Sequence, residues 1–327
     1  MRVLVTGGTG LLGNNVVRQL RERGDDVTAV VRRDPGNEVF AGLDVDLPQG
    51  PLDDPAFVCD CIRGQDAVVH SAGLIHIGRQ RRDESFQVNE GLTATIAEAC
   101  RELGCKLVHV GTVNTMAIGT PDQPSDEETP HQGLAGQIDS SYVASKKAGV
   151  AAVMREVDKG LNATIVHPGF MLGPYDWKPS SGRMMVEVQK AWRPLAPAGG
   201  CSVCDVRDVA AGTLAAMDND VAPGREFILA GENWTYLKLW TEMARRVGRR
   251  PPLKKVGPLP RWIGGIYGDI ASRFGSSEHD LNSTAIAMSS QFHFHSSDRA
   301  RRELGYVRRP VETTLDDAAG WLQRFFR

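Results

Sequence analysis

A glycine-rich turn near the start of the chain constrains the fold more than any other feature. An apolar run leads into TGGTGLLG (6–13), and a segment with the periodicity of an amphipathic helix continues to about Arg23. Gly7, Gly10 and Gly13 allow a tight turn and a close approach of the backbone to a pyrophosphate, whose charge the helix N-terminus meets. Because a β-branched segment follows, the order of elements predicts a dinucleotide-binding unit.

The first half of the chain alternates between strand-like and helix-like segments. Strands are expected near 2–6, 27–31, 67–70, 106–111 and 162–166, and helices near 11–23, 55–63, 86–103 and 140–158. This alternation predicts an α/β fold, a doubly wound parallel sheet of the Rossmann type. From about Pro168 the composition shifts towards proline, glycine, tryptophan and arginine. We therefore expect a dinucleotide-binding domain at 1–170 and a smaller, mostly helical substrate lobe at 171–327, with some of its chain returning to the core.

Composition narrows the range of partners. Of the 327 residues 41% are hydrophobic, and the formal net charge is −2, which gives no electrostatic reason to bind nucleic acid or an anionic membrane. No apolar stretch has the length of a membrane span, and the first apolar run belongs to the glycine motif, which leaves no room for a cleavable signal. The six cysteines fit neither a disulfide framework nor a zinc site. We expect a cytoplasmic protein that acts on small molecules.

The segment SSYVASKKAG (140–149) has a helical pattern and places Tyr142 four residues before Lys146. Residues at this spacing share one face of a helix. An ammonium group beside a phenol stabilises the phenolate and lowers the phenol pKa, which makes the tyrosine a better acid near neutral pH. The pair predicts a tuned general acid, and the alternative is an accidental pair on an exposed helix.

Arg32 and Arg33 follow the second expected strand, where a dinucleotide-binding fold selects its cofactor. An acidic residue there would bind the ribose 2′-hydroxyl and repel a 2′-phosphate. Guanidinium groups instead match a phosphate with forked, charge-assisted hydrogen bonds. The pair predicts NADP(H) in preference to NAD(H), and the alternative is two solvated arginines at a strand end.

With these motifs the chain resembles the extended short-chain dehydrogenase/reductase family, the NAD-dependent epimerases and dehydratases, and within it the dihydroflavonol 4-reductase branch. The likeness extends along nearly the whole length. Beside TGGTGLLG and YVASK, it includes VVHSAG (68–73), NEGLT (89–93), KLVHVGT (106–112), HPGFMLGP (167–174), DVRDVA (205–210) and SSDRARRELGY (296–306).

The resemblance implies a catalytic set and a cofactor site, and no metal. Thr112 would hydrogen-bond a substrate carbonyl and Tyr142 would donate the proton. Lys146 would lower the tyrosine pKa and hold the nicotinamide ribose. Asn89 would orient the neighbouring backbone, and a helix N-cap is an equally good and compatible interpretation of it. The residues implied for the cofactor are Gly7, Thr9, Gly10, Leu11, Leu12, Gly13, Arg32, Arg33, Leu52, Ser71, Ala72, Gly73, Tyr142, Lys146, His167, Pro168 and Gly169.

The chain departs from the family pattern in four places. Pro51 stands where an aspartate commonly contacts adenine, and the glycine of NEGLT (89–93) is displaced by one position. Seven residues before Asp208, where sugar-nucleotide enzymes carry an arginine for the substrate diphosphate, the chain has Cys201. The segment 113–115 lacks the acidic pair of dehydratases. The last two departures disfavour a nucleotide-sugar substrate.

Four further segments carry weaker signals. The polar loop 120–137 is expected to line part of the substrate pocket, and 259–274 is expected either to pack or to act as a lid. His293 and His295 are too few for a metal site without an acidic neighbour. The basic cluster 244–255 is more typical of a solvated helix end than of a nucleic-acid surface.

These features predict an NADPH-dependent reductase of a ketone or aldehyde, which is reversible as a secondary alcohol dehydrogenase. One alternative is an epimerase of sugars that retains its cofactor. Another is a non-catalytic, NADP-binding regulatory protein, which the intact Tyr142 and Lys146 disfavour. A monomer or a homodimer is expected.

Overall fold

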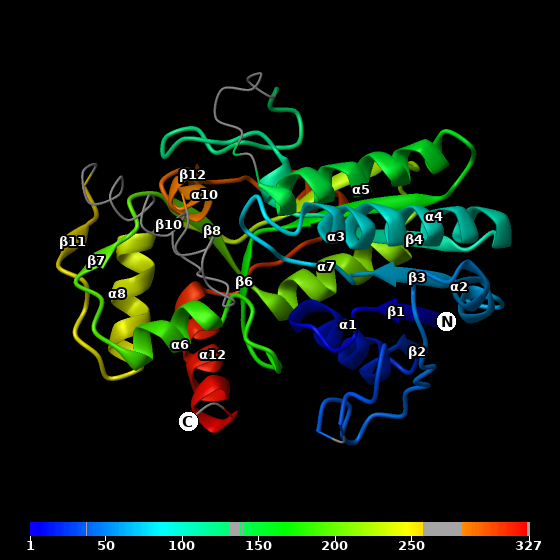
Figure 1. Ribbon diagram of the computed structural model, residues 1–327, viewed down its shortest axis with the longest axis horizontal. Helices are drawn as coiled ribbons and strands as arrows, with labels where there is room; N and C mark the ends of the chain where they lie inside the picture. The colour runs from blue at the N-terminus through cyan, green and yellow to red at the C-terminus, as the bar shows by residue number, and fades with distance from the viewer. Residues whose placement is uncertain (37, 131–137, 139, 258–282, 326–327) are drawn as a thin grey trace.

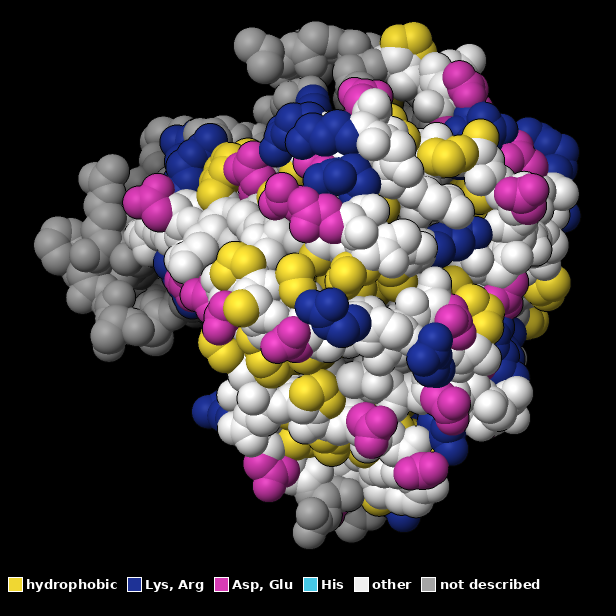
Figure 2. Space-filling model, turned by 90° about the vertical axis from the view of Figure 1, so that its right-hand side faces the viewer, with side chains coloured by type: hydrophobic (Ala, Val, Ile, Leu, Met, Phe, Trp, Pro, Cys, Tyr) yellow, Lys and Arg dark blue, Asp and Glu magenta, His cyan; other side chains and the backbone are white. Residues whose placement is uncertain are grey.

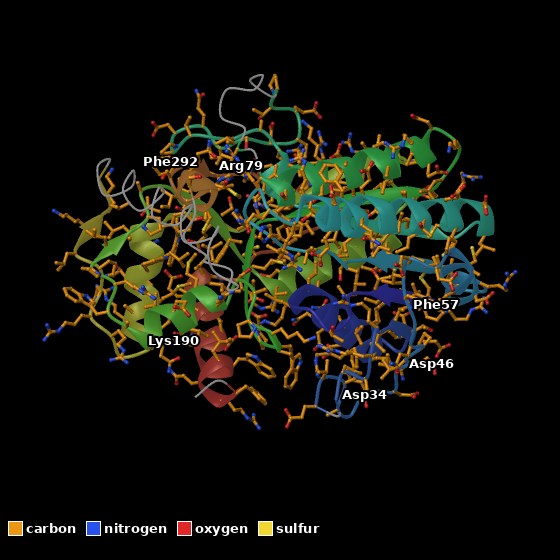
Figure 3. All side chains as sticks on the ribbon, viewed as in Figure 1. Asp34, Asp46, Phe57, Arg79, Lys190 and Phe292 are labelled. Atoms are coloured by element: carbon orange, nitrogen blue, oxygen red, sulfur yellow. The ribbon has the colours of Figure 1, made fainter. Side chains whose placement is uncertain are left out.

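The computed structural model describes residues 1–36, 38–130, 138, 140–257 and 283–325. These residues form two lobes, which lie side by side along the long axis in Figure 1. Phe57 and Lys190 mark them in Figure 3, one in each lobe. The segment 259–274, for which we expect packing or a lid, lies outside the described residues.

A parallel sheet of six strands forms the centre of the first lobe, in the order β2-β1-β3-β4-β5-β9. The strands are β1 (Arg2–Thr6), β2 (Asp26–Val30), β3 (Ala67–His70), β4 (Lys106–Val110), β5 (Ala163–Pro168) and β9 (Arg225–Leu229). Every residue of β3 and β5 is buried, as expected for strands that are covered on both faces. The predicted doubly wound sheet is confirmed.

Helices cover both faces of this sheet (Figure 1). One face carries α1 (Leu11–Glu22), α7 (Val206–Asp218) and α11 (Asp298–Leu304), and the other α2 (Pro55–Ile62), α4 (Leu92–Leu103) and α5 (Ser141–Val157). Since α7, β9 and α11 come from beyond residue 171, the chain returns to the first lobe after entering the second.

The helix expected at 86–103 is divided into three parts. It consists of α3 (Arg82–Phe86), a π-helical turn (Gln87–Gly91) and α4. Asn89 lies inside the π-helical turn, so its interpretation as a helix N-cap is wrong. A Cβ on Gly149 of α5 would lie 2.3 Å from the Asn89 carbonyl oxygen. The glycine therefore lets α5 pack directly against this turn.

The sheet reverses its order beside β1, which has β2 on one side and β3 on the other. Beyond β2, the chain at 46–50 runs parallel to it with single bridges, Thr28 to Asp46 and Val31 to Gln49. In doubly wound sheets, a ligand crevice forms beyond the carboxyl ends of the strands at such a reversal. A dinucleotide crevice is therefore expected between the ends of β1 and β3.

The second lobe combines helices with a small mixed sheet, so it is less purely helical than expected. Its central strand β8 (Gly200–Asp205) pairs with β6 (Phe170–Leu172), β10 (Glu232–Thr235) and β12 (Phe292–His293). The other elements are α6 (Arg183–Lys190), β7 (Leu195–Ala196), α8 (Tyr236–Arg246), β11 (Lys254–Lys255), α10 (Ser283–Met288) and α12 (Val311–Phe325). Leu239, Met243 and Leu315 form the centre of its core.

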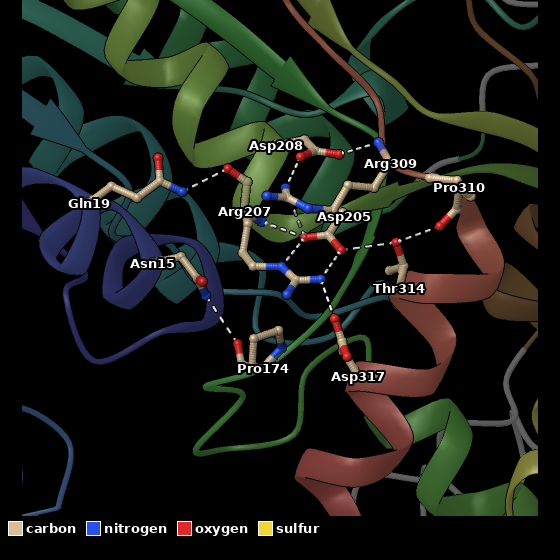
Figure 4. Close-up of polar contacts among 10 residues, drawn as sticks. All are labelled: Asn15, Gln19, Pro174, Asp205, Arg207, Asp208, Arg309, Pro310, Thr314 and Asp317. Atoms are coloured by element: carbon tan, nitrogen blue, oxygen red, sulfur yellow. Dashed lines mark hydrogen bonds and ion pairs between the residues drawn. The ribbon is translucent and has the colours of Figure 1, made fainter. Parts of the chain in front are cut away.

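Polar contacts around the start of α7 join the lobes (Figure 4). Asp205 is fully buried, caps α7 by accepting from Arg207 N, and pairs with the Arg207 guanidinium at 2.6 Å. Arg207 also pairs with Asp317 of α12 at 2.6 Å. On the other side, Gln19 of α1 donates to Arg207 O at 2.8 Å. Arg207 thus connects the helix of the glycine motif to the second lobe, and Asn15 of that helix also donates to Pro174 O at 3.1 Å.

Candidate active site

The glycine turn after β1 has the close packing that its spacing requires. Gly7 has φ +72°, and a Cβ there would lie 2.6 Å from Ala72 N. A Cβ on Gly13 would lie 2.2 Å from Gly7 O, so only glycine lets α1 begin this close to the turn. No side chain caps the first N–H groups of α1, which leaves them able to bind an anion. Leu11 and Leu12 are buried beneath the turn.

The loop after β3 forms the other side of the crevice. Ser71 Oγ donates to Thr6 O at 2.9 Å, and Ala72 N donates to Thr6 Oγ1 at 3.3 Å. A Cβ on Gly73 would lie 3.1 Å from Asn89 Oδ1 and 3.9 Å from Lys146 Nζ. The structure therefore brings 71–73 between the glycine turn and the helix of Tyr142.

Arg32 and Arg33 lie beyond the end of β2, and both are exposed. The next residue, Asp34, lies in the loop below β2 (Figure 3) and accepts a hydrogen bond from Gly36 N. Pro51 is exposed, whereas Leu52 is 9% exposed and packs in the core with Val30. Two cations thus stand beside the expected dinucleotide crevice.

Thr112 and Tyr142 meet through their side chains. Thr112 follows β4 and caps a short 3-10 helix (Val113–Thr115), with Oγ1 accepting from Asn114 N at 3.3 Å. Its hydroxyl also lies close enough to that of Tyr142, near the start of α5, to affect the tyrosine pKa. The Tyr142 ring is partly exposed, but burial of its hydroxyl raises the pKa, and the nearby Thr112 hydroxyl opposes this rise only in part.

Lys146 lies one helical turn after Tyr142 and is buried. Its Nζ donates to Val110 O at 2.5 Å. Burial lowers the lysine pKa to about 8. Burial raises the pKa of Tyr142, so the lowered pKa expected from the spacing to Lys146 is not found.

Asn89 holds the loop after β3 against α5. Its Oδ1 accepts from Leu74 N at 2.8 Å, and its Nδ2 donates to Leu74 O and to Ser145 Oγ, each at 2.9 Å. The side chain is 1% exposed. Asn89 therefore joins the backbone of Leu74 to Ser145 of α5.

His167, Pro168 and Gly169 lie at the carboxyl end of β5. His167 contacts Thr112 O through Nδ1 at 3.2 Å and Glu226 Oε2 through Nε2 at 2.6 Å. A Cβ on Gly169 would lie 2.6 Å from Ser202 O, so glycine allows β8 to approach. These residues lie next to Thr112 and extend the site towards the second lobe.

Buried histidines on the central strands were not identified from the sequence. His70 bonds Thr6 Oγ1 at 2.7 Å and Thr93 Oγ1 at 3.0 Å, and its ring lies 5.4 Å from that of His109. Burial, and secondarily Lys146, lowers the pKa of His70 to about 3 and that of His109 well below its usual value. Both imidazoles are therefore neutral. A signal was present, because two expected strands contain Val-His near the carboxyl end and a third, at 162–166, ends in Val and is followed directly by His167.

The loop after Thr112 is attached to the second lobe. Ser125 Oγ contacts His295 Nδ1 at 2.8 Å, and Ser125 N donates to Phe294 O. Glu127 accepts from Ile228 N at 2.8 Å. The described part of the polar loop thus lies across the ends of the sheet strands, where a substrate pocket is expected, while 131–137 lie outside the described residues.

Cys201 is 4% exposed within β8 and packs in the core of the second lobe with Trp234 and Tyr236. Burial raises the pKa of its thiol to about 12. His293 and His295 are also buried. In the described parts of the chain, no three His, Cys, Asp or Glu side chains are placed to hold a metal ion.

Charges are mixed over the face of the molecule shown in Figure 2, where cationic and anionic side chains are interspersed. This agrees with the small net charge of the chain. None of the helices described combines the length and apolar content that a bilayer span requires.

Comparison with known proteins agrees with this arrangement. The model of the NAD dependent epimerase/dehydratase family matches residues 3–230. Sterol demethylase protein B of Methylococcus capsulatus is 28% identical over 99% of this chain and 98% of its own length. The Synechocystis protein named "Putative dihydroflavonol 4-reductase" is 28% identical over 98% of this chain and 94% of its own length.

Among solved structures, the crystal structure of gox2253 has a TM-score of 0.86 and 29% identity and covers 99% of this chain and 98% of its own. Structures of the same fold at lower identity include NAD complexes. The chain therefore belongs to the NAD-dependent epimerase/dehydratase family of extended short-chain dehydrogenases/reductases, NAD(P)-dependent enzymes that act on alcohol and carbonyl groups.

Proposed function

We propose that this protein is an NADPH-dependent reductase of a ketone or aldehyde, reversible as a secondary alcohol dehydrogenase. The observation that carries the proposal is that the Thr112 hydroxyl lies close enough to the Tyr142 hydroxyl to act on its pKa, with Lys146 one turn further along the helix of Tyr142. Two hydroxyl groups that converge from different elements can both reach one carbonyl oxygen.

The glycine turn fits a dinucleotide, because Gly7 and Gly13 leave no room for side chains and the first N–H groups of α1 are uncapped. A bound nicotinamide supplies the hydride. Tyr142 gives its proton to the carbonyl oxygen, and Thr112 donates a hydrogen bond to the same atom. Lys146 offers a buried cation beside the proton donor and compensates the charge that forms on the phenol oxygen.

In this proposal residues 1–170 bind the cofactor. Residues 171–327 form the substrate side, apart from α7, β9 and α11, which return to the sheet. The cofactor residues are those implied by the resemblance. Arg32 and Arg33 are proposed to bind the 2′-phosphate of NADPH, since both guanidiniums are exposed beyond β2.

A nucleotide-sugar substrate is disfavoured by Cys201, which is buried in an apolar core instead of presenting a charge to a diphosphate. We expect calorimetry on the purified protein to show no micromolar affinity for UDP or dTDP. Tight binding of UDP or dTDP would favour the sugar epimerase over the carbonyl reductase.

Tyr142→Phe tests the acid. A panel of ketones and aldehydes followed by NADPH absorbance should yield a substrate for the wild type. The variant should lose roughly 10²–10⁴-fold in turnover while still binding NADPH, since only the proton donor is missing. Tyr306→Phe is the matched control, because its hydroxyl is buried with no hydrogen-bond partner among the described residues. Equal turnover in both variants would remove Tyr142 from the mechanism.

A further inference from the structure

The two ring nitrogens of His167 both face oxygen atoms. Nδ1 lies 3.2 Å from the carbonyl oxygen of Thr112, and Nε2 lies 2.6 Å from Oε2 of Glu226. His167 is 1% exposed. The imidazole is therefore enclosed between the backbone of one site residue and a carboxyl group of the neighbouring strand.

Hydrogen-bond chemistry restricts where the protons lie. A backbone carbonyl only accepts, so Nδ1 carries a hydrogen. In a neutral ring, Nε2 would then be an acceptor facing a carboxyl oxygen, and such a contact needs a proton between the two atoms. His167 and Glu226 therefore share one proton across the 2.6 Å contact, in addition to the hydrogen on Nδ1.

The strand register places these groups together. His167 pairs with Ile228 and Ile165 pairs with Glu226 across β5 and β9, so the two side chains project from the same face of the sheet. Gly111 provides the space, because a Cβ there would lie 2.6 Å from His167 Nδ1. Any side chain at position 111 would displace the ring from Thr112.

The carbonyl of Thr112 is held by several donors. Besides His167, it accepts from Thr115 N at 3.1 Å and from Thr115 Oγ1 at 2.7 Å. Fixing this carbonyl limits the rotation of the Thr112 backbone and so the direction of its hydroxyl towards Tyr142. The contact from Thr115 is local, whereas the contact through His167 connects Thr112 to β9.

We propose that His167 and Glu226 are a positioning pair for Thr112: Glu226 holds the imidazole, the imidazole holds the Thr112 carbonyl, and the Thr112 hydroxyl is thereby aimed at the substrate oxygen. This inference rests on the proposed role of Thr112 in carbonyl reduction. Neither residue of the pair contacts the substrate carbonyl in this scheme, so towards that atom both act through Thr112, whatever contact His167 also makes with the cofactor.

Charged and titratable groups around the pair come from several elements. His109 of β4 and His295 lie close enough to interact electrostatically with His167, and burial lowers the pKa of both. Arg299 of α11 donates to the backbone oxygen of Glu226. Of these groups, Glu226 is the one whose side chain lies within hydrogen-bond distance of the His167 ring.

Glu226→Gln is the kinetic test. It keeps the shape of the side chain and removes the carboxylate, so we expect kcat to fall about tenfold with KM for both substrates unchanged, which corresponds to ~1.4 kcal/mol, the order of one hydrogen bond. Glu303→Gln is the matched control, since Glu303 pairs with Arg225, the neighbour of Glu226, on the surface. If Glu226→Gln does not fold, Glu226→Asp shortens the same side chain. An unchanged kcat would overturn the proposal.

A double-mutant cycle tests whether Glu226 acts through the ring. In His167→Asn the amide nitrogen can replace Nδ1 as donor to Thr112, but it cannot reach Glu226. Adding Glu226→Gln to His167→Asn should then cause no further loss of kcat. If instead the double variant lost kcat by the product of the two single losses, the two residues would act separately, which contradicts a positioning pair.

Proton NMR tests the shared proton without any turnover. The wild type should show a strongly downfield ring N–H signal that is absent from His167→Asn and from Glu226→Gln and is retained in Glu303→Gln. Its absence from the wild type would refute the pair. Because this readout needs no substrate, the pair can stand even if no carbonyl is reduced, and the two proposals fail separately.

Discussion

The side chain of Asn89 donates from Nδ2 to Ser145 Oγ at 2.9 Å, which joins a π-helical turn to the helix that carries Tyr142 and Lys146. The same amide bonds both backbone groups of Leu74. One asparagine therefore fixes the loop after β3 relative to the proposed proton donor.

Asn89→Ala should lower the free energy of unfolding by ~1–3 kcal/mol, because backbone groups of Leu74 lose their partners in a partly buried place. Urea denaturation measures the loss. Thr95→Val is the control, since it removes an exposed hydroxyl that bonds Gly91 O nearby, and it should change stability by less than ~0.5 kcal/mol. Equal effects would mean that the Asn89 contacts contribute nothing specific.

Gly13→Ala should both destabilise the protein and weaken cofactor binding, because the new Cβ would lie 2.2 Å from Gly7 O. Overpacking of this kind costs ~1–3 kcal/mol. Gly320→Ala on α12 is the matched control: its Cβ would meet nothing within 4 Å, so it should stabilise the helix by ~0.5–1 kcal/mol. Unfolding curves and NADPH fluorescence titrations of both variants check this, and normal binding by Gly13→Ala would contradict the site.

Arg32→Ala should weaken NADPH binding by roughly 10–150-fold, the factor that corresponds to one charge-assisted hydrogen bond. NADH binding should hardly change, because NADH has no 2′-phosphate. A small loss in this variant with a large loss in Arg32→Ala/Arg33→Ala would show that the arginines share the contact. Arg63→Ala, another exposed arginine, is the control. If the wild type binds both cofactors equally and neither variant alters the ratio, the NADP preference is wrong.

Lys146 should give the folded protein a distinctive dependence on pH. Burial lowers its pKa from 10.5 to about 8. Below pH 8 the lysine is charged in both the folded and the unfolded chain. Burying the charged group then lowers the free energy of unfolding by its full amount. Between pH 8 and 10.5 the unfolded chain keeps a proton that the folded chain has released, so stability rises with pH, by ~3 kcal/mol in total.

Urea unfolding of the wild type and of Lys146→Met between pH 8 and 10.5 measures this effect. The free energy of unfolding of the wild type should rise with pH relative to that of the variant. Lys147→Met is the control, because Lys147 is exposed on the same helix and its removal should leave the slope as in the wild type. A constant difference between the wild type and Lys146→Met would show that burial does not shift this lysine.

The sequence by itself determined the parallel sheet, its five first strands and the glycine turn. These depend on periodicity and on spacings between near neighbours, and those are local properties of a chain. The sequence also determined that Tyr142 and Lys146 share a helix face, because residues four apart in a helix lie on the same face. The helix expected at 86–103 is present, but the sequence did not show its π-helical turn, where Asn89 contacts Leu74 and Ser145, residues that no local pattern brings together.

Only the tertiary structure decided which side chains meet across the sheet. Glu226 reaches His167 because β9 pairs with β5, although the chain passes through the second lobe between them. The tertiary structure also decided the direction of the pKa shift at Tyr142. The spacing to Lys146 predicts a lower pKa, but burial of the tyrosine hydroxyl raises the pKa. Strand order and desolvation both depend on groups that are distant in the chain, so they appear only when the fold is complete.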